Sequence, residues 1–554
     1  MESSGQKSPI SRRTLIAGAG ATAAAAVVVA ACGDDDDNDS TSGGTEPPGG
    51  TDAPDATTGD TTGGAPSDVK TGGTLRVGMV GSTNDIIDGQ YIVTKTDQWR
   101  LVLGWEPLVH YDAVFQLSYE HALATGIDAE APDHYIVHLR EGVTFHDGKP
   151  MTSADVIYSF SRRLDEASDV YAPGLAAYLA LDGVTAVDDL TVDIKLLQPA
   201  VTFLNTLAEY TQTVVPEGYT RESDPQIGTG PFILDSFTPG AESVHKRNPN
   251  YWGGSDIPYL DEVQVIDFAD STAMINALKA GEVDCIAEVP YASADAVKGD
   301  GVELLVSEGG SWLVITMAID QAPMDDVRVR QAMRLICDRD EMVNRVIAGY
   351  GTVANDLYGK LDACYSSNGL EQRVQDLEQA KALLEEAGQA GMTIDLFAPD
   401  DTAGLPELIA VFAEQAEGAG ITVNAEVLDG GTYWGDEYCK RTLATSFWNF
   451  RPYLPQAAAG ALATATYPET HWPPEGSDFQ ANYDAALAEV DEEARCEIIH
   501  KMMKEEWETG GNIIPFYNNL VDAYGDYVKG LEPRKNVLNL DHYGRGMKRV
   551  WLDV

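Results

Sequence analysis

Cysteine is scarce in this sequence, with 6 residues among 554, and no two of them form a C-x-x-C pair. Zinc and redox sites that depend on closely spaced thiols are therefore not indicated. Cys32 lies near the N-terminus, and the odd number that remains leaves at least one unpaired thiol. Cys337 and Cys496 lie in helical patterns and are interpreted as small core residues. A disulfide between Cys364 and Cys439 stays open.

Basic residues are also few: the chain has 37 Lys and Arg against 88 Asp and Glu, a formal net charge of −51. A surface this acidic repels nucleic acid and anionic lipid headgroups. Nucleic-acid binding is therefore excluded. Hydrophobic residues make up 44% of the chain, which is enough for a large core and more than one lobe.

The common catalytic motifs are missing as well. The sequence has no H-E-x-x-H and no G-x-S-x-G, and its 9 histidines do not cluster as zinc ligands. His134 and His138 share one face of an alternating strand predicted at 133–140, but two histidines without a third ligand do not make a zinc site. We therefore predict no catalytic residue, metal or cofactor. A triad built from distant residues is recognised by geometry, so a secreted hydrolase stays as an alternative.

The N-terminal region has the pattern of an export signal. A twin arginine at positions 12 and 13 precedes an uncharged Ala/Val run over residues 17–31, which is short for a bilayer-spanning helix. The small residues before Cys32 resemble the lipobox of bacterial lipoproteins, in which the cysteine is acylated and becomes the first residue. We therefore predict a twin-arginine lipoprotein signal peptide over residues 1–31 and a lipid anchor at Cys32.

Residues 32–72 are rich in Asp, Gly, Thr and Pro and contain almost no large apolar residue. Such a segment cannot bury enough surface to offset its conformational entropy. We predict a disordered acidic tether that holds a folded body at the outer face of the cytoplasmic membrane.

The stretch FHDGKPMTSADV, residues 145–156, brings His, Asp, Lys, Thr and Ser together as a catalytic cluster would. However, Thr152-Ser153-Ala154-Asp155 fits a helix capping box, and Asp147-Gly148 fits a turn. The pattern predicts a strand that ends at Phe145 and a helix from Ser153 to Arg163. These polar residues are therefore interpreted as the corner between a strand and a helix.

Several motifs occur in order along the chain. Leu139–Pro150, running into Ala154-Asp155-Val156, resembles the signature of the bacterial extracellular solute-binding proteins of family 5, the peptide- and nickel-type receptors of ABC importers. The other segments that resemble this family are Gly228–Phe232, Arg247–Trp252, Tyr259–Val263, Ala280–Asp284 and Val327–Ala332. The resemblance covers residues 73–554.

The resemblance implies an α/β, two-lobed fold of the periplasmic-binding-protein type (type II, like the large cluster C members, with an extra inserted subdomain). We expect Gly228–Pro231 to mark a crossing between the lobes, and one helix from Val327 to Ile347, capped by Asp325 or Asp326. The expected parts are lobe I at 73–110, 223–316 and 516–554, an inserted subdomain at 111–222, and lobe II at 317–515.

The implied function is that of a receptor for an ABC importer. A solute between the lobes contacts both of them only when they close, so it shifts an open–closed equilibrium. The expected partners are a small polar or peptide-like solute, an ABC permease with its ATPase subunits, and the membrane through the lipid anchor; a monomer is expected. A ligand sensor that is not coupled to transport is a further alternative.

The segment Thr445–Tyr453 supplies the first candidate ligand contacts, namely Trp448, Asn449, Arg451 and Tyr453. In peptide-binding relatives a Trp here is followed by an Asp that meets the peptide ammonium group. In this chain the acid is missing, so a free peptide amino terminus is doubtful. Arg451 instead favours a carboxylate or other anionic head, unless it pairs with an acid of the chain.

Other candidate contacts come from three further places. Asn84 and Asp85 follow the alternating strand that the sequence predicts at 73–80, where relatives contact their ligand. Trp312 and Met317 lie where the chain crosses toward lobe II. The remaining candidates are Tyr433 and Trp434. For every aromatic in this set, ordinary packing is the alternative.

Overall fold

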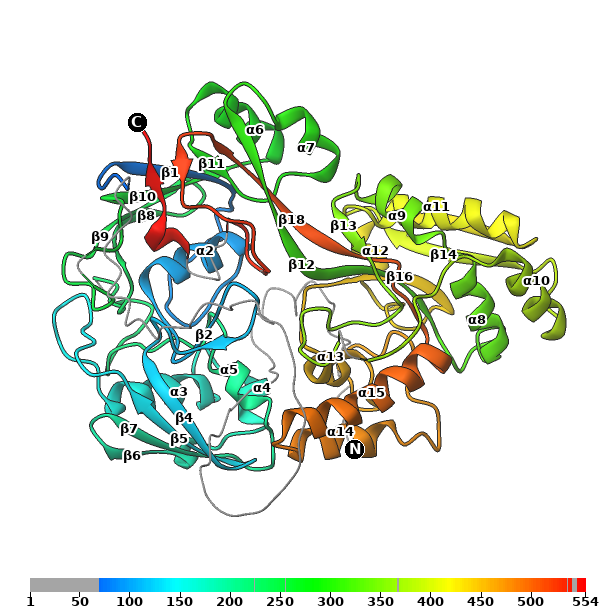
Figure 1. The fold of residues 1–554 in the computed structure, drawn as a ribbon, viewed down its shortest axis with the longest axis horizontal. Helices are drawn as coiled ribbons and strands as arrows, with labels where there is room; N and C mark the ends of the chain where they lie inside the picture. The colour runs from blue at the N-terminus through cyan, green and yellow to red at the C-terminus, as the bar shows by residue number, and fades with distance from the viewer. Residues whose placement is uncertain (1–68, 224, 255, 366–367, 536, 541–545) are drawn as a thin grey trace, which may run out of the picture.

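The computed structural model describes residues 69–554, apart from positions 224, 255, 366–367, 536 and 541–545. The predicted signal peptide, Cys32 and nearly all of the predicted tether lie outside the described residues. Through the described part runs one mixed sheet of 12 strands, whose main path is β15-β14-β16-β12-β18-β11-β1-β10-β9-β8. Helices cover this sheet at both ends, which gives two lobes (Figure 1).

Lobe I is built on β1 (Thr74–Val80), the strand that the alternating pattern at the start of the body predicts. It pairs in parallel with β10 (Glu262–Phe268) and β11 (Cys285–Ile286), which extends the sheet on both sides. The other elements of this lobe are β8 (Phe232–Thr238), β9 (Glu242–Arg247), α2 (Lys95–Gly104), α6 (Ser271–Ala280) and α7 (Tyr291–Val297).

Residues 111–222 contain a separate sheet of four antiparallel strands in the order β4-β5-β7-β6. The predicted strand around His134 is present as β5 (His134–Leu139), with alternate residues buried. Its two histidines bind different carboxylates rather than one metal. The remaining elements are β4 (Ala124–Ala131), β6 (Val184–Asp188), β7 (Thr191–Lys195), α3 (Ser153–Leu164), α4 (Pro173–Ala176) and α5 (Phe203–Thr206).

The corner at residues 145–156 is confirmed as a turn followed by a helix, but the predicted strand end at Phe145 is wrong. Strand β5 ends at Leu139, and Thr144 makes only an isolated bridge with Pro150. Helix α3 begins at Ser153, and the Thr152 amide donates to Asp155 Oδ2 at 2.8 Å, as in a capping box. The His146 ring is held by lobe I, because its Nε2 lies 3.1 Å from the Gly230 carbonyl oxygen. Burial lowers the pKa of His146 to about 4, so the imidazole is neutral.

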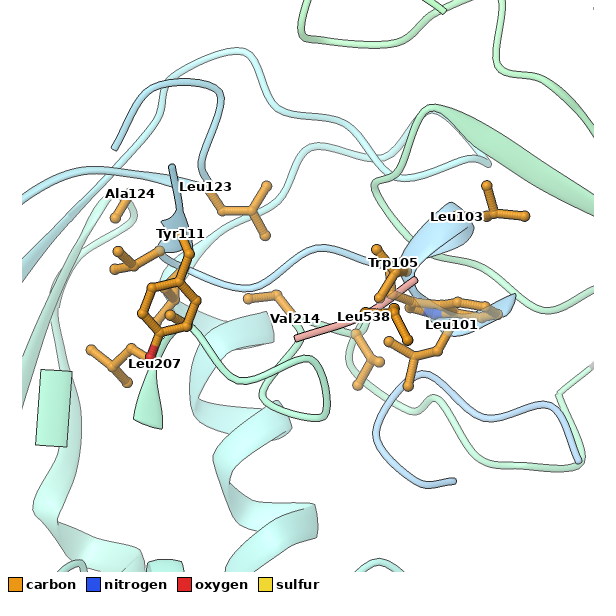
Figure 2. Close-up of a cluster of buried hydrophobic side chains, with 14 of the residues drawn as sticks. Leu101, Leu103, Trp105, Tyr111, Leu123, Ala124, Leu207, Val214 and Leu538 are labelled. Atoms are coloured by element: carbon orange, nitrogen blue, oxygen red, sulfur yellow. The ribbon is translucent and has the colours of Figure 1, made fainter. Parts of the chain in front are cut away.

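One continuous hydrophobic core joins lobe I to the inserted sheet. It runs from Leu75 and Val77 of β1 to Val192 and Ile194 of β7. Figure 2 shows Val214 between a group of side chains around Tyr111 and another around Trp105. Because breaking this core would expose many apolar side chains to water, the inserted subdomain moves with lobe I.

Lobe II has two cores of its own, but Leu361 and Phe450 of this lobe pack with the core of lobe I. Its strands are β14 (Thr393–Pro399), β15 (Thr422–Leu428), β16 (Leu443–Trp448), β13 (Gly351–Val353) and β17 (Asn512–Ile513). Its helices are α8 (Val327–Leu335), α9 (Arg339–Val346), α10 (Leu377–Glu386), α11 (Leu405–Gly418), α12 (Gly430–Tyr433), α13 (Tyr453–Gly460), α14 (Phe479–Ala488) and α15 (Glu492–Thr509).

The single helix predicted from Val327 to Ile347 is wrong, because the chain forms α8 and α9 with a break between them. Asp326 caps α8, as expected. Asp338 then caps α9 by accepting from the Glu341 amide at 2.9 Å. A second N-cap within the apolar pattern starts a new helix and changes its direction.

The lobes are connected by two long antiparallel strands, β12 (Val302–Met317) and β18 (Phe516–Gly525), which extend from one lobe to the other in Figure 1. Their register shifts between Ser307 and Ser311, which marks a bulge. The crossing predicted at Gly228–Pro231 is wrong: that segment lies in lobe I, where the Gly230 amide donates to the Gly104 carbonyl at 3.0 Å.

The cysteine pairing also differs from the expectation. Cys364 forms a disulfide with Cys496, and Cys439 is partly buried outside this disulfide. Cys496 lies on a helix, α15, as predicted. It is not simply a small core residue, because its disulfide connects α15 to Cys364. Cys337 is fully buried, which confirms its prediction. Sequence spacing could not select the partner because the two half-cystines are 132 residues apart.

Candidate functional site

Strand β16 places the first group of candidate residues at the centre of lobe II. It lies between β12 and β14, with Trp448 opposite Trp312 in the antiparallel ladder with β12. The chain leaves the sheet after Trp448, so Asn449 is exposed and Arg451 is partly buried. Tyr453 then begins α13. The end of β16 therefore carries the segment toward the side of the molecule on which lobe I lies.

Aromatic rings form a stack beneath this segment. Trp448 lies over Trp312 with centroids 6.5 Å apart, Trp312 over Tyr358 at 6.1 Å, and Tyr358 over Tyr453 at 4.9 Å. The Arg451 guanidinium lies 5.3 Å from the centroid of the Trp448 ring. The structure thus brings Trp312, Trp448, Tyr453 and Arg451 together, as stacked rings with a cation at one end.

The rings in this stack are buried and held by acids. Trp448 Nε1 donates to Glu469 Oε2 at 3.0 Å, and Ser446 Oγ donates to Glu469 Oε1 at 2.6 Å. Tyr453 is fully buried, and its hydroxyl donates to Glu506 Oε2 at 2.6 Å. These contacts give Trp448 and Tyr453 a scaffold role in this conformation. Sequence reasoning missed Glu469 and Glu506, because their tyrosine and tryptophan partners are distant in sequence and no local motif marks either acid.

Tyr433, Trp434 and Met317 lie away from this stack. The Tyr433 hydroxyl donates to the Thr445 carbonyl at 2.6 Å, and Trp434 Nε1 donates to Asp401 Oδ1 at 3.1 Å. Met317 is completely buried in the core beneath the lobe II helices. Their packing accounts for all three without a ligand.

Asn84 and Asp85 lie in different environments. Asn84 is exposed in the turn after β1. Asp85 is 3% exposed and forms an ion pair with Arg100, with Asp85 Oδ2 2.8 Å from Arg100 Nη1. Arg100 also donates to Asp267 Oδ1 at 2.5 Å. Asp85 is therefore part of a buried charge network in lobe I.

Lobe I and lobe II contact each other through aromatic side chains near the crossing strands. Phe450, next to the candidate segment, meets Phe115 edge to face with centroids 5.2 Å apart, and Phe115 stacks on Tyr111 at 4.1 Å. Farther out, the Val201 amide donates to the Leu487 carbonyl of α14 at 3.1 Å. Figure 1 shows α4 and α5 of the inserted subdomain beside α14. The lobes are in a closed arrangement.

A small cavity, about large enough for one water molecule, lies in the inserted subdomain close to this junction. Its walls come from α3, from the segment around α4, from α5 and from residues 209–212. Sequence reasoning missed its polar lining, which consists of Arg163, Thr206, Glu209, Thr211 and Gln212. These residues are not adjacent in sequence, and only the fold of the subdomain brings α3 next to the 203–212 segment.

Glu209 connects this cavity to lobe II electrostatically. Burial raises the pKa of the Glu209 carboxyl to about 7, while the positive charges of Arg451 and Arg163 act to lower it. Arg451 therefore faces an acid of the other lobe, as the alternative in which it pairs with an acid of the chain requires.

Metal chemistry has no support in the described residues. His134 Nε2 lies 2.9 Å from Asp193 Oδ1, and His138 Nε2 lies 2.8 Å from Asp128 Oδ2. Within residues 69–554, less the positions left out above, no group of three or more His, Cys, Asp or Glu could hold a metal ion. In the same part of the chain, no helix has the length and apolar character needed to span a membrane.

These features agree with the comparisons to known proteins. Residues 118–469 match the model of the bacterial extracellular solute-binding proteins, family 5 Middle. The chain belongs to this family. The solved substrate-binding protein CtaP of an ABC transporter from Listeria monocytogenes superimposes with a TM-score of 0.75 at 22% identity, over 88% of this chain and 100% of that one. The two-lobed α/β fold is therefore confirmed.

Two relatives bind different ligands, as their names state. The chain is 29% identical to the dipeptide-binding protein of Escherichia coli, over 55% of this chain and 62% of that protein. It is 31% identical to heme-binding protein A of Haemophilus influenzae, over 46% of this chain and 51% of that protein. The matches thus span less than two thirds of either relative. Both relatives are binding proteins, not enzymes, which fits the lack of a catalytic motif.

Proposed function

We propose that this chain is the extracytoplasmic receptor of an ABC importer, which captures a polar solute between its lobes and delivers it to a membrane permease. The observation that carries the proposal is the connection between the lobes: most of lobe II packs in cores of its own, and β12 and β18 with their bulge at Ser307/Ser311 join it to lobe I. Family membership supports the same reading.

In such an architecture, the binding energy of the solute is used to close the lobes. A solute that moves closure from about 1% to about 99% must prefer the closed form by about 5.5 kcal/mol. A few buried polar contacts from the solute to both lobes are of the right size to supply this preference. The contact between Phe115 and Phe450 favours the closed form with or without solute. The chain needs no bond-breaking group for this task.

The decisive experiment is native mass spectrometry of the protein as purified, combined with small-angle scattering before and after removal of any bound solute. We expect a copurified small molecule, and a larger radius of gyration once it is removed. A single shape with every solute offered would contradict the proposal. Loss of uptake of that solute in a deletion strain would separate an import receptor from a sensor.

We further propose that the solute carries a negative or neutral polar head, because Arg451 occupies the place where peptide-binding relatives have an acid. Calorimetry of the wild type and of Arg451→Ala with the copurified solute tests this. We expect at least a tenfold weaker affinity in the variant if a charge-assisted hydrogen bond is lost, on the order of 1.5–3 kcal/mol. Equal affinities would reject the role of Arg451.

For localisation, we propose export by the twin-arginine signal and acylation of Cys32, with the protein acting as a monomer. The small residues before Cys32 and the uncharged run before them support this. Partitioning of wild type and Cys32→Ala into detergent is the test. The wild type should enter the detergent phase, and the variant should stay in water.

A further inference from the structure

Glu469 lies in lobe II between α13 and α14, and its buried carboxylate accepts hydrogen bonds from three side chains. The residue is 8% exposed. Trp448 Nε1 donates to Oε2 at 3.0 Å, Ser446 Oγ donates to Oε1 at 2.6 Å, and the Tyr438 hydroxyl donates to the same Oε1. Because an ionised carboxylate offers acceptors and no donor, it can satisfy all three groups at once. Glu469 therefore joins the end of β16 to the segment around Tyr438.

The hydrogen bond from the indole determines how the Trp448 ring lies. Nε1 is the only donor of a tryptophan side chain, and a buried indole normally has an acceptor. Elsewhere the ring packs against Trp312, with planes 17° apart, and meets Tyr467 edge to face with centroids 5.5 Å apart. Apolar packing is less directional than a hydrogen bond. The bond to Glu469 therefore sets the final orientation of the ring.

Arg451 depends on the orientation of that ring. Its guanidinium carbon lies 5.3 Å from the centroid of the Trp448 ring. A cation is attracted to the face of an aromatic ring, where the negative end of the ring quadrupole lies. A ring that turns therefore moves the favourable place for the guanidinium, and with it the direction in which Arg451 presents its donors.

We propose that Glu469 is a positioning residue of the solute site: by holding the Trp448 indole, it places the Arg451 guanidinium and so raises the affinity for an anionic head. The inference rests on the proposed receptor function and on the proposed role of Arg451 in it. It adds a residue that acts on the solute from behind the ring, through Arg451 and without touching the solute.

The first test labels the full chain with 5-fluorotryptophan and follows Trp448 by fluorine NMR. Among the 9 tryptophans, its resonance is the one that Trp448→Phe removes. Arg451→Ala should shift this resonance, because the guanidinium leaves the ring face. Glu469→Leu, which has a similar size but accepts no hydrogen bond, should shift it as well. Adding Arg451→Ala to Glu469→Leu should then cause no further shift, because coupled residues are not additive, whereas independent sites are.

The second test titrates acetate into the same labelled protein at constant ionic strength. Acetate is the simplest carboxylate head, and its neutral amide, acetamide, is the matched probe. We expect acetate, but not acetamide, to shift the Trp448 resonance of the wild type, and neither probe to shift that of Arg451→Ala. In Glu469→Leu the apparent affinity for acetate should be weaker by about two- to fivefold, the fold-change that a partly exposed cation–π contact represents.

A conservative variant separates positioning from a general loss of charge. Glu469→Gln can still accept from the Trp448 indole, because the hydroxyls of Ser446 and Tyr438 can turn to accept from its NH₂ group. It should therefore restore the wild-type affinity for acetate. If Glu469→Leu does not unfold cooperatively on heating, Glu469→Asp takes its place with the same expectations, because its shorter side chain withdraws from the indole.

Asp401 supplies a matched control. It is another acid of lobe II that accepts from an indole, with Trp434 Nε1 3.1 Å from Asp401 Oδ1, but it lies away from the ring stack. Asp401→Asn should leave the Trp448 resonance and the binding of acetate unchanged.

Additive shifts from Glu469→Leu and Arg451→Ala, or equal affinity for acetate in the wild type and Glu469→Leu, would overturn the proposal. If acetate and acetamide act alike on the wild type, or neither acts, Arg451 is not a contact for an anionic head, and the proposal falls with that role. The receptor function stands or fails separately, on whether the radius of gyration changes when a bound solute is removed.

Discussion

Glu506 is a buried carboxyl group that two tyrosines share. The Tyr358 hydroxyl donates to Oε1 at 2.8 Å, and the Tyr453 hydroxyl donates to Oε2 at 2.6 Å. Burial raises the pKa of Glu506 to about 7 from the ordinary value of 4.5, although these two hydrogen bonds act to lower it. Glu506 thus links the ring stack of lobe II to α15. Its ionisation also makes the stability of the folded protein depend on pH.

The sign of that dependence follows from linkage. The pKa in the folded state is above the unfolded value, so the contribution of Glu506 to stability is fully present below about pH 4.5 and is lost as pH rises through about 7. The expected loss is on the order of 3 kcal/mol. In Glu506→Gln, denaturant unfolding at pH 5 and pH 8 should show a smaller difference than in the wild type. An unchanged difference would mean that Glu506 ionises normally.

The Asp85–Arg100 pair provides a second prediction for single residues. Asp85→Asn removes one acid from a fully buried guanidinium, so the free energy of unfolding should fall by about 3 kcal/mol. Asn84→Ala, at the exposed neighbouring position, is the control and should change little. If Asp85 instead contacts a solute, the variant would lose affinity without losing stability.

Asp85 and Glu506 show which structural roles cannot be predicted from residue types alone. Asp85 and Glu506 look like any other acids in a chain with 88 of them. Their roles depend on partners 15 and 148 positions away, respectively. Local motifs succeed where the partners are neighbours in sequence, as for Thr152 and Asp155 in the capping box.

For helices and strands, the sequence patterns predicted that an element exists better than they predicted where it ends. The strand β1 and the helix α3 begin where alternation and capping place them. The apolar spacing over 327–347 continues through a break, so periodicity alone joined α8 to α9. Asp338 with Glu341 has the D-x-x-E form of an N-cap and was the available signal.

The disulfide allows a prediction for α15. Cys364–Cys496 closes a loop of 132 residues, so its loss relaxes a large constraint on the unfolded chain. Cys496→Ser should lower the free energy of unfolding by about 2–5 kcal/mol in denaturant titrations under oxidising conditions. Cys439→Ser, which changes a thiol outside the disulfide, is the matched control. Equal stability of the two variants would show that the disulfide adds nothing.

At the scale of the whole molecule, family motifs predicted two lobes, but not how they are joined. Gly228–Pro231 looked like a crossing because glycine and proline commonly end elements. The actual connection is β12 with β18, and β12 is a 16-residue strand whose composition does not reveal which lobe each half serves. The cavity in the inserted subdomain was likewise hidden, because its polar residues meet only after α3 packs beside residues 203–212.

Adding a single methyl group at Gly310, in the bulge of β12, should change the open–closed equilibrium. A Cβ at Gly310 would lie 2.4 Å from Phe450 Cδ2 and 3.2 Å from Leu361 Cγ. The Phe450 ring is the side chain that meets Phe115 of the other lobe. Gly310→Ala should therefore displace Phe450 and weaken the closed form, because the contact between Phe450 and Phe115 joins the two lobes in this arrangement.

We expect Gly310→Ala to bind the copurified solute more weakly than the wild type, and to need more solute before its radius of gyration falls. The weaker binding follows because part of the binding energy is used to restore the closed form. Gly126→Ala, where a Cβ meets no atom within 4 Å, is the control and should match the wild type in both measurements. If Gly310→Ala keeps the wild-type radius and affinity, the Phe115–Phe450 contact does not hold the lobes together, and the energy of closure must come from the solute and the junction around Glu209 and Arg451.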